Sequence, residues 1–188
     1  NALDANTTGS FNTANGMHAL GGNQTGTNNS ALGYAALFVN TTGQFNVAVG
    51  SNALNDNTTA SNNTAVGYFA LKQNTTGTSN VAVGANALDS NIDGDFNTAL
   101  GHNSLSAATS AGSNVAVGYF ALNATTTGGG NTALGANALT SNTTGIRNTA
   151  IGQAALTSNT TAQFSVAIGF RALKVNTTGG SNVAVGSG

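Results

Sequence analysis

The 188-residue sequence contains no cysteine, proline or tryptophan, and only nine of its residues are charged, four Lys or Arg and five Asp. Without cysteine, disulfides and thiolate metal sites are excluded. A net charge of −1 gives no electrostatic footprint for nucleic acid or for an anionic lipid surface. No apolar run approaches the roughly 18 residues that span a bilayer. The sequence therefore excludes a nucleic-acid platform and membrane insertion of this segment.

What the sequence does contain is one 17-residue repeat. The string N-[TVS]-A-[VLI]-G recurs every 17 residues from residue 12 to residue 182, with departures only at Asn15 and Ser165. The full unit reads N-x-A-V-G-x-x-A-L-x-x-N-T-T-G-x-x, and we number its positions 1 to 17 from the first Asn. No insertion interrupts it, so residues 1–188 form a single repeat array. Because the array starts within a unit, we expect a segment of a longer chain.

The unit predicts a parallel β-solenoid. Its apolar stretches are short and glycine-type turn points interrupt them, so a helix of about 10 to 12 residues does not fit. Two short strands and two turns would close one coil, and stacked coils lie about 4.8 Å apart. We therefore predict an all-β solenoid, or flattened β-roll, of eleven 17-residue coils.

The recurring residues predict where the interior lies. Leu at position 9 should form an internal column with Ala at positions 3 and 8, since charges avoid these positions. Gly at position 5 is expected to turn the chain, with positive φ or close backbone approach. Asn at positions 1 and 12 should form ladders between coils at the corners. Strand alternation separates positions 2 and 4 from positions 3 and 5, and parity alone leaves open which pair lines the coil.

A coil with so few large apolar residues has a thin core. Burial of one Leu, two Ala and one Val-like residue stabilises modestly against an ordering cost of about 1 to 2 kcal/mol per residue. We therefore expect an uncharged face of the rod to pack on other copies of the chain, as a trimer or a filament. A self-sufficient monomeric solenoid is the alternative interpretation.

The side chains of common enzyme mechanisms are missing, and we predict that the chain is not an enzyme. Glu is absent, and the only two histidines, His18 and His102, lie five repeats apart, which is roughly 24 Å at solenoid spacing. The triplet Gly128-Gly129-Gly130 is followed by Asn131 rather than by the Lys of a phosphate-binding loop. Both histidines are predicted to be surface residues.

The string S-V-A-I-G at 165–169 and the N-x-A-V-G strings resemble the head repeats of trimeric autotransporter adhesins. In that family a short unit forms a left-handed parallel β-roll, and three rolls pack into a trimer. The 17-residue form N-T-A-L-G-x-x-A-L-x-x-N-T-T-G is also similar to repeat arrays in tail-fibre proteins of phages and bacteria. The resemblance implies a left-handed roll, a homotrimer and a location on a bacterial cell surface or a phage virion appendage.

Two functions from different classes follow. The first is a structural, adhesive extracellular fibre segment that spaces or presents binding surfaces, with a glycan or a cell-surface receptor as the candidate partner. The alternative is an ice-binding solenoid, because Thr occupies positions 13 and 14 in nine of eleven units each. Stacked Thr ranks would form a hydroxyl lattice, although adjacent strand residues point to opposite faces.

One acidic turn breaks the repeat. Asp89, Asn91, Asp93 and Asp95 follow the order D-x-N-x-D-G-D, which matches the start of a calcium loop. Leu100 stands where such a loop has its bidentate Glu. The pattern predicts a weak Ca²⁺ site at a corner of the roll, and a merely solvated acidic turn is the alternative.

Aromatic residues gather at two unit positions. Tyr34, Tyr68 and Tyr119 share position 6, and Phe69 and Phe120 share position 7. These rings are expected at an outer edge, where they would stack on sugar rings or meet a partner chain. Packing over the turn to cover the Leu column is the other interpretation.

N-x-[ST] sequons also recur at position 12, for example at Asn40 and Asn57. Glycans on successive coils about 4.8 Å apart would collide. We therefore predict little or no glycosylation of these sites.

Overall fold

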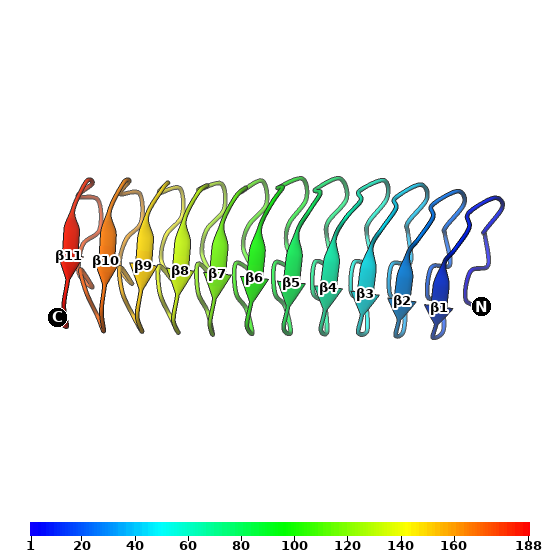
Figure 1. Ribbon diagram of the computed structural model, residues 1–188, viewed down its shortest axis with the longest axis horizontal. Coiled ribbons are helices and arrows are strands. Elements are labelled where there is room, and N and C mark those ends of the chain that lie inside the picture. Colours follow the sequence, from blue (N-terminus) through cyan, green and yellow to red (C-terminus); the bar gives the residue numbers. More distant parts are fainter.

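Each repeat forms one coil of a parallel β-solenoid. The computed structural model describes all of residues 1–188 and contains eleven three-residue strands, paired in parallel in chain order with a register of 17 residues. Figure 1 shows them side by side along a rod whose two termini lie at opposite ends. The strands are β1 (Thr13–Asn15), β2 (Ser30–Leu32), β3 (Val47–Val49), β4 (Thr64–Val66), β5 (Val81–Val83), β6 (Thr98–Leu100), β7 (Val115–Val117), β8 (Thr132–Leu134), β9 (Thr149–Ile151), β10 (Val166–Ile168) and β11 (Val183–Val185).

This architecture confirms the predicted all-β solenoid of 17-residue coils. The chain has no helix that is long and apolar enough to cross a membrane.

The prediction of two strands per coil was wrong, because each coil has a single strand followed by a run of turns. Residues at positions 7 and 9 adopt left-handed backbone conformations, as at Asn86 and Leu88, both with φ of 53°. Left-handed residues at alternate positions cannot build an extended strand. Their amides bond neighbouring coils instead: Leu88 N donates to Ser104 O at 3.0 Å, and Asn86 N donates to Tyr68 O at 2.9 Å.

Glycine at position 5 turns the chain out of each strand, as predicted. Gly118, for example, has a φ of +133°, and a Cβ built on it would lie 2.7 Å from the carbonyl carbon of Gly135 in the next coil. Both the backbone conformation and the close approach of stacked coils therefore require glycine here.

The interior consists of the predicted Leu and Ala columns. The side chains at position 9 are fully buried from Leu20 to Leu156, and Ala at positions 3 and 8 packs beside them in one continuous cluster. Since Ala at position 3 faces inward, positions 2 and 4 of each strand face outward. The structure thus settles the choice that strand parity left open.

Two internal ladders of asparagine close the corners, which confirms the expectation for positions 1 and 12. At position 12, Asn40 Nδ2 donates to Asn23 Oδ1 at 2.7 Å and to Gly43 O at 3.1 Å. At position 1, Asn29 Nδ2 donates to the same Gly43 oxygen at 2.8 Å, and its Oδ1 accepts from Asn46 N at 3.0 Å. All four asparagines are fully buried, so the amides satisfy polar groups that water cannot reach.

Candidate functional surfaces

The most extensive exposed feature is the outer side of the eleven strands, which we call the strand face and define as unit positions 2 and 4. Five residues at position 2 and ten at position 4 are Val, Leu or Ile, and none of either set is charged. Leu32, Leu100 and Leu134 are each about half exposed, at 50%, 46% and 47%. The large aliphatic side chains of the strands therefore point to solvent, while the small Ala points to the core.

The strand face matches the largest apolar patches of soluble monomers in size. Eleven strands at about 4.8 Å give a length near 50 Å, and the three residues of each strand give a width near 10 Å. The resulting area of about 500 Å² lies in the upper part of the roughly 300 to 600 Å² range of the largest patch on a typical monomer, and such a patch is often functional. Six of the eleven position-2 residues are Thr or Ser, so part of this area is polar.

The acidic turn does not gather its four predicted ligands. Asn91 points into the core, where Nδ2 donates to Asn74 Oδ1 at 2.7 Å and to Gly94 O at 3.0 Å. Asp93 is exposed, and no group of three or more His, Cys, Asp or Glu side chains is placed to hold a metal ion. The Ca²⁺ site remains a prediction from the sequence, and the turn as it folds does not support it.

The other two aspartates of this turn have separate roles. Asp95 Oδ1 accepts from Thr78 N at 2.6 Å and from Thr78 Oγ1 at 2.9 Å, one coil back. Asp89 has a buried Oδ1 with no hydrogen-bond partner. Burial raises the pKa of the Asp89 carboxyl above its ordinary value, against the lowering effect of its own backbone amide and of Lys72.

The aromatic residues of positions 6 and 7 lie at an exposed edge beyond the strand face. Tyr68 stacks on Phe69 with ring centroids 3.9 Å apart, and Tyr119 lies 4.5 Å from Phe120. His102 stacks on Tyr119 at 5.6 Å. Tyr68 and Tyr119 remain about half exposed, so the rings cover one another and part of the turn while leaving faces open to solvent.

The threonine ranks of positions 13 and 14 differ in their environment. At position 13 the threonines are half-buried and their hydroxyls bond the next coil: Thr41 Oγ1 donates to Thr58 O at 3.0 Å, and Thr58 Oγ1 donates to Thr75 O at 3.1 Å. The position-14 side chains, as at Thr42, are exposed. The position-13 hydroxyls therefore form hydrogen bonds between neighbouring coils.

The position-12 sequons of the inner coils lie inside the rod, and only those of the terminal coils, at Asn6 and Asn176, are not fully buried. The side chains of Asn40, Asn57 and Asn74 are fully buried, and each Nδ2 donates to the ladder. The nitrogen that would carry a glycan is unreachable in the folded coil, which is a stronger obstacle than the collision between neighbouring glycans.

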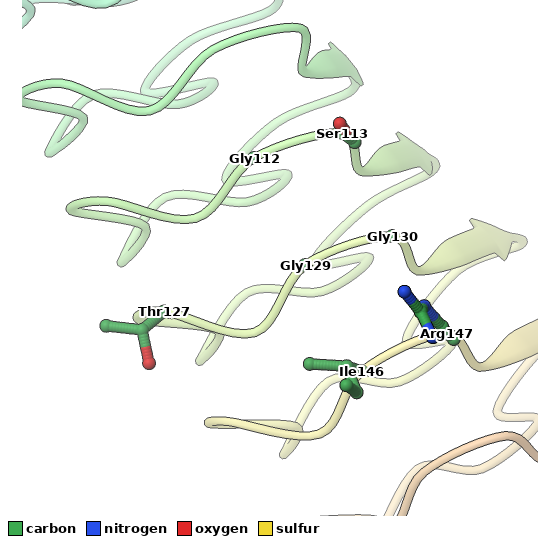
Figure 2. A pocket seen from close by; sticks show the side chains of 7 residues that line it. All are labelled: Gly112, Ser113, Thr127, Gly129, Gly130, Ile146 and Arg147. Carbon is green, nitrogen blue, oxygen red and sulfur yellow. The ribbon is translucent and has the colours of Figure 1, made fainter.

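An open hollow of about 450 Å³ lies on the flank between the Asn-Thr turn and the strands, and the sequence did not predict it. Figure 2 shows Gly112 with Ser113 and Gly129 with Gly130 on adjacent coils, and Arg147 on the coil beyond. The hollow exists because positions 16 and 17 carry almost no side-chain volume in these two coils. The one signal for it in the sequence is the run of three glycines at 128–130.

Comparison with known proteins assigns no family: no family model, no curated protein and no solved structure matches this chain. The surfaces themselves are therefore the guide to function.

Proposed function

We propose that the chain is a structural, adhesive segment of an extracellular fibre, in which solenoids associate with copies of themselves through the strand face. The observation that carries the proposal is the uncharged aliphatic face on a rod whose interior is built from Leu and Ala. The resemblance of its repeat to adhesin-head and tail-fibre arrays supports the same function, and with it a location on a bacterial surface or a phage appendage.

A second copy of the chain is the partner that fits this face best. Two parallel sheets pack face to face about 10 Å apart when their outer side chains interdigitate. The area of about 500 Å² estimated above supplies more than half of the roughly 800 Å² that one partner contributes to a standard protein interface. No charge on positions 2 or 4 would be left buried and unpaired in such a contact.

The ice-binding alternative has less support. Its hydroxyl lattice needs ranks of free threonine hydroxyls, yet most position-13 hydroxyls donate to the next coil, as at Thr109 and Thr143. On the strand face only five position-2 residues are Thr, and position 4 has none. A thermal-hysteresis assay on the chain is the direct measurement for this alternative.

Sedimentation equilibrium tests the proposed self-association. We expect the parent chain to be an oligomer at micromolar concentration, and the double variant Val83→Lys with Val117→Lys to be a monomer with an unchanged circular dichroism spectrum. The buried lysines would cost more than the interface gains. Thr76→Lys with Ser110→Lys, at the exposed position-14 corner, is the matched control and should remain oligomeric. A parent chain that is monomeric with full β-structure would contradict the proposal.

A further inference from the structure

The hollow beside Gly112 and Gly129 has the features of an anion site, starting with its backbone. At position 16 the backbone amide points toward the side chain of position 16 in the next coil. Asp95 Oδ1 occupies that place over Thr78 N at 2.6 Å, and Ser61 Oγ occupies it over Gln44 N at 3.0 Å. The Asp95 contact therefore shows that the backbone amide of position 16 can bind a carboxylate oxygen.

In the hollow the same amide has no such partner. A Cβ on Gly129 would stand 3.9 Å from Gly112 N, so a side chain at 129 would reach over that amide as Asp95 reaches over Thr78. Gly112 N, like most amides at position 16, makes no hydrogen bond within the chain, and because Gly129 has no side chain nothing at position 16 of the next coil covers it. The Gly112 amide is therefore free to donate a hydrogen bond to an oxygen atom of a ligand.

A free positive charge borders the same hollow. Arg147 leans over Gly130, with its Cγ 3.4 Å from where a Cβ of Gly130 would lie, and its guanidinium sits 5.6 Å from the Phe164 ring centroid. Asp95 is the last acidic residue of the sequence, three coils or about 14 Å away. Arg147 therefore has no carboxylate of its own chain to pair with, and the ring restricts its motion.

We propose that this hollow binds the carboxylate of an acidic saccharide. The carboxylate would accept from Gly112 N–H and from the guanidinium of Arg147, a charge-assisted pair of contacts. The hydroxyls of Ser113 and Thr127, which line the hollow, suit the hydroxyl groups of a sugar ring. This inference is independent of the proposed self-association, because the site belongs to one chain.

The surroundings favour a saccharide over an acidic peptide or a simple anion. Phe96, 64% exposed, holds position 17 one coil before Ser113, and Phe164, 49% exposed, lies beyond Arg147. Exposed rings at both ends of a hollow that is lined by hydroxyl groups and by Ile146 match the alternating apolar and hydroxyl faces of a sugar oligomer. The hollow is open to solvent, so its volume of about 450 Å³ admits a sugar ring without enclosing it.

Isothermal titration calorimetry of the full chain with trigalacturonic acid tests the proposal. We expect binding of the trimer and none of neutral galactotriose. Arg147→Gln should weaken binding at least tenfold, whereas Arg171→Gln should leave it unchanged. Arg171 is the matched control because it also packs on a phenylalanine ring, Phe170 at 4.7 Å, outside the hollow.

A second variant tests the geometry itself. Gly129→Asp should place a carboxylate over Gly112 N as Asp95 does over Thr78, and so abolish binding of the trimer while the fold stays intact by circular dichroism. Four results would overturn the proposal: no binding at millimolar trimer, an equal loss in Arg171→Gln, unchanged affinity in Gly129→Asp, or equal affinity for acetate or triglutamate. The last would reassign the hollow to carboxylates in general.

Discussion

A buried polar atom without a hydrogen-bond partner lowers the stability of the coil that contains it. The position-12 ladder runs unbroken from Asn6 to Asn91 and then meets Ala108, so Asn91 Oδ1 is buried without a partner. Thr125 occupies the following rung, and the ladder resumes at Asn142, whose Nδ2 donates to Thr125 Oγ1 at 3.3 Å. The interruption costs the desolvation of one buried acceptor.

Completing this ladder should stabilise the rod. The double variant Ala108→Asn with Thr125→Asn supplies a donor to Asn91 Oδ1 and a continuous chain of amides to Asn142. We expect its free energy of unfolding to rise by about 1 kcal/mol for each hydrogen bond gained. The rise should exceed the sum of the two single changes, because either change alone leaves an amide group unpaired.

Urea denaturation of the parent, the two single variants and the double variant measures this coupling. A double variant no more stable than the parent would show that the open rung is already satisfied.

Asp89 also has a buried oxygen without a partner, and it predicts that the stability of the rod depends on pH. Position-10 side chains elsewhere donate to the position-7 carbonyl of the preceding coil, as Asn123 Nδ2 does to Asn103 O at 3.1 Å. Ionised Asp89 has no proton to donate, and burial raises its pKa above 3.8. The folded state holds this proton more tightly than the unfolded state does. The free energy of unfolding therefore falls as pH rises from the unfolded-state pKa of Asp89 to its folded-state pKa, and the loss is complete above the folded-state pKa.

Asp89→Asn should therefore raise the melting temperature at pH 7, and its advantage should shrink below about pH 4. Melting curves at both pH values make the comparison. Asp93→Asn, an exposed residue of the same turn, is the control and should change neither curve. An equal effect of the two variants would assign the gain to net charge rather than to the Asp89 site.

At the scale of the coil, the sequence predicted the features that repeat and missed those that depend on backbone conformation. Invariant Ala, Gly and Leu identified the core columns and the turn, and recurring Asn identified the ladders. The left-handed conformation of Leu88 was not predictable, because a large aliphatic residue normally avoids it. Burial of Leu88 in the column compensates for the strain, and tertiary packing thereby overrides local preference.

The candidate sites follow the same division. The orientation of the strand face needed the structure, because alternation gives two faces without saying which is inside. Asn91 looked like a metal ligand in the sequence, but it is one rung of a buried ladder. The hollow at Gly112 depends on which side chains are absent from neighbouring coils, and a search for chemically active residues does not detect such an absence.

The Leu column should carry much of the stability of each coil. Leu122→Ala is expected to lower the free energy of unfolding by about 2 to 5 kcal/mol, because Leu122 is fully buried and its truncation would leave a cavity in the packed column. Leu100→Ala makes the same chemical change at a residue that is 46% exposed and should cost far less at equal protein concentration. Similar losses in urea denaturation would contradict an inward-facing column.

At the scale of the whole molecule, charge is divided along the rod. All five Asp lie within the first 95 residues together with a single Lys, and only Arg147, Arg171 and Lys174 are charged beyond them. The acidic half and the basic half attract each other at low salt, over distances limited by a screening length of about 10 Å. Association through the strand face should nevertheless be insensitive to salt, because that face carries no charge.

Cross-linking at the middle strand tests the self-association of the strand face most directly. β6 is the sixth of eleven strands, so it meets the same strand of a second copy whether two rods pack parallel or antiparallel. The chain has no cysteine, and Leu100→Cys therefore gives one thiol on the strand face, while Ser110→Cys gives one on the exposed corner of the same coil. With a bismaleimide about 10 Å long, matched to the spacing of packed sheets, we predict rapid cross-linking of Leu100→Cys and little of Ser110→Cys. Equal cross-linking of both, or none of Leu100→Cys at concentrations where the chain is oligomeric, would contradict the account.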